Sequence, residues 1–289
     1  MANLPGDSIQ IARDYMESLL VESRIVGAVA PSTRFQFLGQ VFETPIMTAA
    51  LSHIDLVGMA TGAAEAGAPV SIGMGENNEF GAVLATGARV MKIIKPYADP
   101  ESIFNRIRYA EEHGAMAVGM DVEHSIRPDS ADPDAVNGIE MRLPSLEELR
   151  LYIGSTNLPF FIKGALSVQD ALRCAELGCA GIILSHHNGL MRYAVPPVML
   201  LPEIRSALGD RLLLIADGGM ESGYDVFKAL ALGADAVTVG RPLMEPLREK
   251  GSKGVAEVIT TMTRQLQAMM YRTGSKDLKS IDPGVIRRK

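Results

Sequence analysis

Short apolar runs alternate along the chain with stretches in which apolar residues recur every three or four positions. The runs are continuously apolar, which is typical of parallel strands buried on both faces of a sheet. Eight strands are predicted, at 45–50, 69–72, 90–94, 117–120, 160–163, 181–184, 212–216 and 236–239. Amphipathic helices are predicted between them, among others at 99–113, 145–152, 167–177, 198–208 and 222–232.

Three of the joins between a helix and the next strand repeat one pattern, in "EEHGAMAV", "AELGCAGI" and "LALGADAV". In each, a glycine follows the helix, where the left-handed backbone conformation that ends helices favours glycine. Repeated strand–helix units predict an α/β fold, a (β/α)8 TIM barrel. We expect a single domain over residues 1–289, in which residues 1–40 form an N-terminal helical extension.

One connection is much longer than the others and follows the fourth strand. It reads "DVEHSIRPDSADPDAVNGIEMRLP", residues 121–144, and is polar and rich in Pro and Asp. Long loops at the carboxyl ends of barrel strands often cover the site. We therefore predict a mobile lid at 122–144, with a solvated insertion of no functional role as the alternative.

Composition narrows the classes of partner and location. The 289 residues are 47% hydrophobic, and the net charge is −6 with no long run of one sign. This argues against a nucleic-acid partner or an acidic membrane. No apolar run reaches about 18 residues, and no basic segment followed by an apolar one begins the chain. The two cysteines show no metal or disulfide spacing, so a cytoplasmic location is expected.

Polar residues follow the predicted strands, and the carboxyl ends of barrel strands surround the site of a barrel enzyme. The residues concerned are Ser52, Lys92, Asp121, Lys163, Ser185, His186, His187, Asp217, Gly218, Gly219, Gly240 and Arg241. The glycine pair after strand seven and the "VGRP" after strand eight expose backbone N–H groups beside an arginine. This arrangement predicts a phosphate site, although the glycines alone would also suit tight turns.

Lys163 ends an otherwise apolar strand. A lone ammonium in a barrel mouth costs several kcal/mol unless it is paired. It is therefore expected to meet an anion or an electron-rich ring, with a Schiff-base nucleophile or a lysine that reaches solvent as alternatives.

Two segments resemble the FMN-dependent α-hydroxy-acid oxidases and dehydrogenases, the family of glycolate and lactate oxidases. They are "FIKGALSVQDALRCAELGCAGIILSHHNG" and "IADGGMESGYDVFKALALGADAVTVGRPL". Weaker similarity extends the match from about 37 to 281. The resemblance implies bound FMN, a small-molecule substrate and a homo-oligomer, by family a tetramer. The chain is identified as a divergent member, because several family residues are changed.

The resemblance also implies roles for individual residues. Lys163 would lie beside the flavin ring, and Ser185 would contact its polar edge. His187 falls on the catalytic histidine that takes the hydroxyl proton, and Asp121 on the carboxylate that orients it. The remaining cofactor residues would be Ser52, Lys92, Asp217, Gly218, Gly219, Gly240 and Arg241.

The departures from the family concern the substrate. The arginine that clamps the substrate carboxylate in the family is replaced by Leu190, and a phosphate-side arginine by Glu221. Leucine does not replace a bidentate arginine. Arg127, Arg192 and His186 are therefore candidate substrate residues.

The sequence predicts an FMN-dependent oxidoreductase that oxidises a 2-hydroxy acid or a related hydroxy compound by passing a hydride equivalent to flavin. The alternatives are an FMN-dependent isomerase or lyase on the same barrel, and a flavin-free phosphate-binding barrel that uses Lys163. No metal site is predicted.

Overall fold

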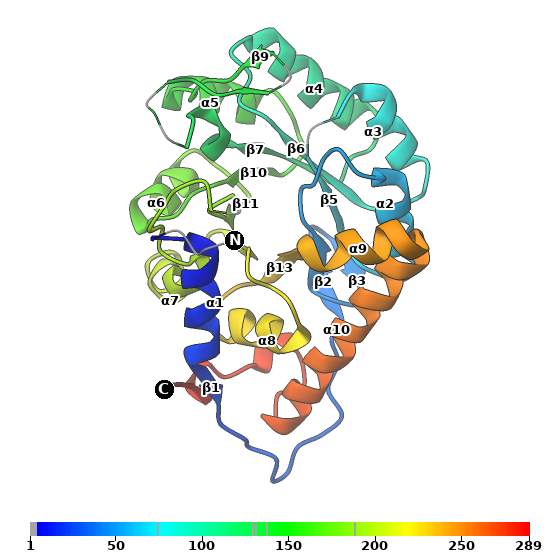
Figure 1. The fold of residues 1–289 in the computed structure, drawn as a ribbon, viewed down its shortest axis with the longest axis vertical. Helices are drawn as coiled ribbons and strands as arrows, with labels where there is room; N and C mark the ends of the chain where they lie inside the picture. Colours follow the sequence, from blue (N-terminus) through cyan, green and yellow to red (C-terminus); the bar gives the residue numbers. More distant parts are fainter. Residues whose placement is uncertain (1–4, 74, 129, 131, 137, 188) are drawn as a thin grey trace.

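The computed structural model describes residues 5–73, 75–128, 130, 132–136, 138–187 and 189–289. Eight parallel strands form one sheet in the spatial order β4-β13-β12-β11-β10-β7-β6-β5. The strands are β4 (Ile46–Thr48), β5 (Val70–Ile72), β6 (Val90–Ile94), β7 (Ala117–Asp121), β10 (Phe160–Lys163), β11 (Gly181–Leu184), β12 (Leu213–Asp217) and β13 (Ala236–Val239). A parallel bridge between Leu51 and Ile72 and two hydrogen bonds of the Thr48 hydroxyl with the Ser71 backbone connect β4 to β5. The predicted (β/α)8 barrel is confirmed (Figure 1).

Helices surround the strands (Figure 1). They are α2 (Leu56–Glu65), α3 (Asn77–Leu84), α4 (Pro100–Glu112), α5 (Leu146–Gly154), α6 (Val168–Glu176), α7 (Pro197–Leu208), α8 (Gly223–Ala231), α9 (Arg241–Lys250) and α10 (Ser252–Arg272). The five helices predicted by range are all present. Asp99, Ser145, Ser167 and Ser222 cap four of them by accepting backbone N–H groups of the first turn, as short polar side chains do at helix starts. The three glycines predicted after helices, Gly114, Gly178 and Gly233, all have positive φ angles.

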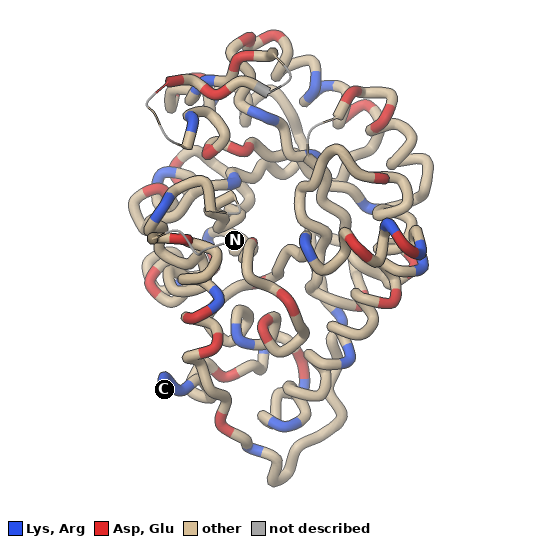
Figure 2. The backbone as a smooth tube through the Cα atoms, in the orientation of Figure 1, with Lys and Arg blue, Asp and Glu red and all other residues tan. Residues whose placement is uncertain are grey.

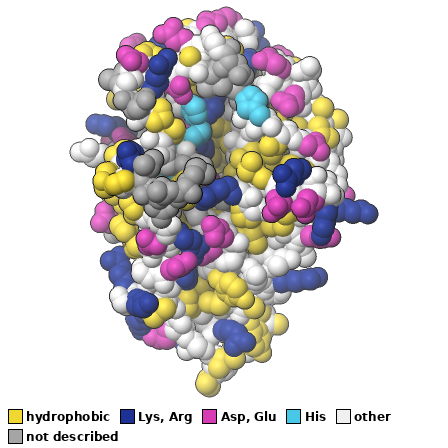
Figure 3. Space-filling model, in the orientation of Figure 1, with side chains coloured by type: hydrophobic (Ala, Val, Ile, Leu, Met, Phe, Trp, Pro, Cys, Tyr) yellow, Lys and Arg dark blue, Asp and Glu magenta, His cyan; other side chains and the backbone are white. Residues whose placement is uncertain are grey.

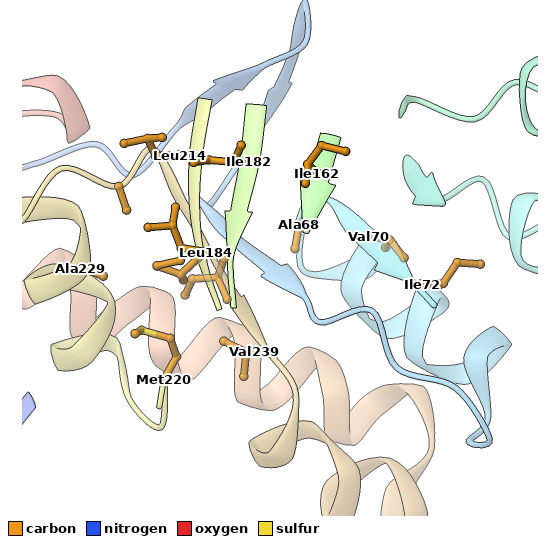
Figure 4. Close-up of a cluster of buried hydrophobic side chains, with 14 of the residues drawn as sticks. Ala68, Val70, Ile72, Ile162, Ile182, Leu184, Leu214, Met220, Ala229 and Val239 are labelled. Carbon is orange, nitrogen blue, oxygen red and sulfur yellow. The ribbon is translucent and has the colours of Figure 1, made fainter. Parts of the chain in front are cut away.

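The strand side chains separate into two cores. One lies inside the barrel, where Met47, Met91, Ile93, Phe161 and Ile183 pack together. The other lies between the strands and the helices, and Figure 4 shows part of it. Successive residues of each strand enter opposite cores, because side chains alternate across a sheet. This explains why the strands read as continuously apolar.

From residue 5 on, the N-terminal extension contains one helix and three short strands, the last of which ends at Phe42. Helix α1 (Ser8–Ser18) leads into β1 (Leu19–Val21), which pairs with β14 (Ile286–Arg288) near the other end of the chain. Strands β2 (Phe35–Phe37) and β3 (Gln40–Phe42) form a hairpin whose phenylalanines pack with Phe161, in the first half of β10, inside the barrel. The hairpin therefore covers the amino end of the barrel and leaves the carboxyl end to the site.

The long connection after β7 has local structure. The 3-10 helix η1 (Val122–Ser125) comes first, followed by the hairpin strands β8 (Ala135–Val136) and β9 (Ile139–Glu140).

Two further 3-10 turns, η2 (Leu278–Ser280) and η3 (Pro283–Val285), precede β14. Charges of both signs are interspersed along the chain (Figure 2). Within the described ranges, no helix is long and apolar enough to span a bilayer.

Candidate active site

Three side chains that the sequence singles out meet at the carboxyl ends of neighbouring strands. Asp121 ends β7 and Lys163 ends β10, and the two residues are direct partners in the parallel ladder. His187 follows β11. Its Nδ1 lies 3.0 Å from Asp121 Oδ2 and 3.1 Å from Lys163 Nζ. Lys163 Nζ lies 3.4 Å from the same carboxylate oxygen. The fold therefore brings the predicted catalytic residues into contact.

The backbone at His187 is held in an unusual conformation, with φ at 42°. The His187 N–H donates to the Ser185 hydroxyl oxygen at 3.0 Å, which fixes the turn. Non-glycine residues rarely adopt positive φ, and such strain is frequent at functional sites. We assign the Nδ1 proton to the bond with Asp121, because a carboxylate is the stronger acceptor. The other ring nitrogen, Nε2, is then free to accept a proton.

The charges of this cluster stabilise one another. Burial opposes ionisation of Asp121, but Lys163, His187 and a further lysine, Lys95, outweigh it and hold its pKa well below the ordinary value. Burial also opposes the charge of Lys163, but its pKa is raised because Asp121 and other carboxylates surround it. For His187, burial lowers the pKa against the opposing hydrogen bond of Asp121. The arrangement contains an ionised carboxylate, a charged lysine and a neutral imidazole, as a general base requires.

A second group of hydrogen bonds connects strands β11, β12 and β13. The Ser185 hydroxyl donates to Asp217 Oδ2 at 2.7 Å, and the Thr238 hydroxyl donates to Asp217 Oδ1 at 2.6 Å. Lys163 Nζ lies 3.9 Å from Asp217 Oδ2. Both oxygens of this carboxylate are therefore occupied, and it fixes the strand ends next to His187.

A pocket of about 290 Å³ opens beside this cluster. It is lined by Ala49, Ala50, Leu51, Lys163, His187, Asp217, Gly218, Gly219, Met220, Glu221, Thr238, Gly240, Arg241, Pro242 and Met244. Figure 3 shows histidine, lysine or arginine, and hydrophobic side chains around a hollow near the centre of one face. Half of the apolar residues come from the segment after β4, and the polar residues come from β10 to β13 and the segments that follow them.

One end of the pocket has the features of a phosphate site. Gly218 and Gly219 have φ angles of 97° and 74°, and a Cβ atom on Gly219 would extend into open space with nothing within 4 Å. Gly240 caps α9, whose first residue is Arg241. Unpaired N–H groups at a helix start attract anions. A phosphate beside Arg241, with an aromatic ring toward Lys163 and His187, matches the chemistry of these residues, so they fit FMN.

Glu221 also lines this end of the pocket, where a carboxylate would repel a phosphate. Its Oε2 lies 3.8 Å from an Arg13 nitrogen, and its side chain is half exposed. Arg13, on α1, also binds Asp225 at 3.0 Å and donates to the Gly219 carbonyl at 3.4 Å. The N-terminal helix therefore contributes a cation next to the glycine loop, which the sequence interpretation missed.

The remaining predicted residues lie apart from the pocket lining. Lys92 is buried and donates to the Gly73 carbonyl at 2.7 Å. Ser52 is half-buried. Arg127 donates to the Pro133 carbonyl at 3.3 Å within the long loop, and Arg192 donates to the Pro5 carbonyl at 2.7 Å. Both arginines are exposed, so neither candidate substrate arginine is brought to His187 in this structure.

His186 is buried and its ring binds the backbone of its own loop. Its Nδ1 accepts the Gly189 N–H at 3.0 Å, which places the ring proton on Nε2. That Nε2 is buried without a hydrogen-bond partner among the described residues. Since the nearby Gly218 belongs to the glycine loop, His186 supports this loop rather than the base.

The sequence interpretation also missed three other candidate residues, Lys95, His124 and Glu123. Lys95 Nζ lies 2.9 Å from Asp121 Oδ2. The rings of His124 and His187 meet edge to face at 4.3 Å, and His124 Nδ1 lies 2.7 Å from Asp134 Oδ2. Burial raises the pKa of Glu123 to about 8. The available signal was position, because Lys95 directly follows β6 and the other two lie within three residues after Asp121. Over the described ranges, no group of three His, Cys, Asp or Glu residues is placed to hold a metal.

The family model described as FMN-dependent dehydrogenase matches residues 127–288. The chain belongs to this family. An L-lactate oxidase of Alicycliphilus denitrificans is 38% identical over 156 residues, which cover 54% of this chain and 43% of the relative. An L-lactate oxidase of Lactobacillus jensenii is 29% identical over 294 residues, which cover 89% of this chain and 72% of the relative. The stronger match thus spans less than half the length of the relative.

Solved structures of the family extend the likeness over nearly the whole chain. A mandelate oxidase variant with (S)-mandelic acid superposes with a TM-score of 0.89 at 25% identity, covering 98% of this chain and 90% of the other. Another variant, with a monooxide FMN adduct, gives a TM-score of 0.87 at 26% identity. The predicted family and its cofactor, FMN, are confirmed.

Proposed function

We propose that this protein is an FMN-dependent oxidoreductase that oxidises a 2-hydroxy acid or a related hydroxy compound, with His187 as the base. One observation carries the proposal: the His187 ring is bound to the ionised Asp121 through Nδ1, and the ring borders the pocket. Lactate, mandelate and other 2-hydroxy-acid oxidases are among the relatives. FMN, when bound, would accept the hydride equivalent from the substrate carbon.

The residues of the chain divide the remaining work. His187 Nε2 takes the hydroxyl proton, while Asp121 fixes the ring and stabilises the imidazolium that forms. The charged Lys163 lines the pocket and would supply positive charge beside a bound flavin ring. Gly218, Gly219 and Arg241 would hold its phosphate. Positioned bases of this kind contribute roughly 10²–10⁴-fold to a rate.

The identity of the substrate is a separate question, because neither Arg127 nor Arg192 takes the place of the missing clamp. Leu190 stands at the position of the family arginine, and Arg127 and Arg192 bind backbone carbonyls elsewhere. This observation favours a hydroxy compound without a small, arginine-bound carboxylate, and keeps an FMN-dependent isomerase or lyase as the second candidate.

The flavin-free alternative is disfavoured by the state of Lys163. A Schiff-base lysine must be neutral to attack a carbonyl. Burial works against the charge of Lys163, but the surrounding carboxylates raise its pKa. The ammonium form therefore dominates at neutral pH, where it cannot act as a nucleophile.

Anaerobic mixing with a panel of hydroxy compounds tests the proposal. The panel contains lactate, mandelate, longer 2-hydroxy acids and their neutral amides. We expect at least one compound to bleach the flavin band near 450 nm. A protein that binds FMN but is bleached by none of them, while rearranging an unsaturated substrate, would support the isomerase instead.

We further propose a homo-oligomer, which by family would be a tetramer. The proposal also includes a cytoplasmic location and a single domain over residues 1–289. They rest on the family resemblance and on composition. Sedimentation of the flavin-loaded protein tests the first, with a tetramer expected and a monomer at micromolar concentration as the contrary result.

A further inference from the structure

One oxygen of Asp121 is shared by three nitrogen atoms. Lys95 Nζ, His187 Nδ1 and Lys163 Nζ lie 2.9, 3.0 and 3.4 Å from Oδ2. The other oxygen, Oδ1, is buried without a hydrogen-bond partner in the described part of the chain. Two lysine amino groups and the imidazole therefore converge on one oxygen of a single carboxylate. Burial lowers the pKa of Lys95, and the neighbouring Asp121 opposes this and favours the ammonium form.

Lys95 is the closest of the three and has a simple local origin. It follows directly after β6, and the Tyr97 N–H donates to its carbonyl oxygen in a tight turn. Its side chain is 8% exposed, and the bond to Asp121 is the only hydrogen bond or ion pair found for its ammonium within the described ranges. Burying a lysine is costly unless it is paired, so the site retains Lys95 through Asp121.

We propose that Lys95 is a positioning residue for His187: it holds Asp121 as an anion on the oxygen that binds the imidazole, and offsets part of the charge that would otherwise favour an imidazolium. The inference rests on the proposed function of His187 as a base. A neighbouring carboxylate favours the charged ring, and a neighbouring ammonium disfavours it. With Lys95 in place, His187 stays neutral, and able to accept a proton, down to a lower pH.

The other charged groups around His187 must be taken into account. Asp121, Lys163 and Asp217 end strands β7, β10 and β12. The titratable Glu123 and His124 lie on η1, next to Asp121. Asp121 raises the pKa of His187, and Lys163 lowers it together with Lys95. Lys163 cannot be removed cleanly, because it also faces the pocket and Asp217. Lys95 is therefore the cation whose effect on the base can be isolated.

Titration of His187 by NMR in the flavin-loaded protein, without substrate, measures this effect. The chain has five histidines, and His187→Gln identifies the resonance. In Lys95→Met, we expect the pKa of His187 to rise by roughly 1 unit. Lys95→Gln keeps a donor without the charge and should give the same rise, which also covers a failure of the methionine variant to fold. Lys95→Arg keeps the charge and should leave the titration in place.

The pH profile of anaerobic flavin reduction gives a second readout. The acid limb of the profile should move up in Lys95→Met and Lys95→Gln and stay in place in Lys95→Arg. An unchanged His187 titration in both neutral variants, or an equal shift in the arginine variant, would overturn the proposal.

The titration also separates this proposal from the proposed function. If the pKa moves as expected and no hydroxy compound bleaches the flavin, the role of Lys95 stands and the substrate assignment fails. If the flavin is bleached and the pKa of His187 does not move, the proposed function stands and the role of Lys95 fails.

Discussion

The two halves of the barrel end their strands in different ways. Strands β10 to β13 end in side chains that bind one another and line the pocket, with Lys163, His187 and Asp217 at the centre. Strand β6 instead carries Lys92 and is followed by Lys95, and both lysines lie outside the pocket lining. The family model matches residues 127–288, within which β10 to β13 lie. Most of the predicted cofactor residues and the proposed base thus lie in the second half, where Leu190 and Glu221 also depart from the family. The first half and η1 add Lys95 and His124 around Asp121 and His187.

The largest effect is expected on the free energy of unfolding, when a buried lysine of the second half and a buried lysine of the first half are each replaced by methionine. Lys163→Met leaves Asp121 and Asp217 without their shared cation, and breaking a buried ion pair costs about 3–5 kcal/mol. Lys92→Met is the matched control, because Lys92 binds carbonyl oxygens rather than a carboxylate. Because burial already disfavours the charge of Lys92, this variant should not lower the free energy of unfolding as Lys163→Met does. Urea denaturation measures both, and equal losses would remove the contrast between the halves.

The next effect concerns the phosphate. Arg241→Ala should weaken FMN binding by about 1.5–3 kcal/mol, because a hydrogen bond to a charged group is lost. That corresponds to roughly 10- to 150-fold in Kd, which quenching of FMN fluorescence measures. Arg248→Ala is the control on the same helix, since Arg248 is exposed and pairs only weakly with Glu245. Unchanged affinity in Arg241→Ala would place the phosphate elsewhere.

The stability of the wild type should also depend on pH through Lys92. Burial lowers its pKa from 10.5 to about 8. Between these values the unfolded chain holds a proton that the folded chain has lost, so wild-type stability rises with pH across this window. Lys92→Met lacks this dependence. The stability of the variant relative to the wild type should be highest below pH 8 and decline toward pH 10.5, and a flat difference in denaturation experiments would contradict the burial of a charged Lys92.

Much of the fold could be predicted from the sequence, because its causes are local. Buried parallel strands require continuous apolar runs, and helix ends require glycine at positions such as Gly233, where φ is 115°. Asp121 and His187 were found because both lie at the carboxyl ends of predicted strands and match family positions. Lys95 was missed because its role depends on a side chain that turns inward just beyond a strand. The direction of Arg127 and Arg192, and the approach of Arg13 from a distant helix, depend on packing that no local pattern records.

The last and smallest effect is expected in the hydrogen exchange of the long loop. Its role as a mobile lid stays a prediction. The amides of Arg127 and Met141 donate to loop carbonyls at 3.1 and 2.8 Å. Because strands β8 and β9 have only two residues each, these bonds should open locally. Hydrogen exchange at the two amides should be faster than in β10 without substrate, and slower when substrate is bound. Protection equal to that of β10 in the free protein would exclude a lid.

The most direct test of the account compares the two adjacent histidines in anaerobic stopped-flow reduction with whichever hydroxy compound bleaches the wild-type flavin. His187→Gln should bind FMN normally and slow reduction by about 10²–10⁴-fold, because a positioned base is lost. His186→Asn should reduce at close to the wild-type rate, because His186 faces Gly189 and the glycine loop rather than Asp121. Loss of reduction in His186→Asn with normal rates in His187→Gln, or normal rates in both, would contradict the assignment of His187 as the base.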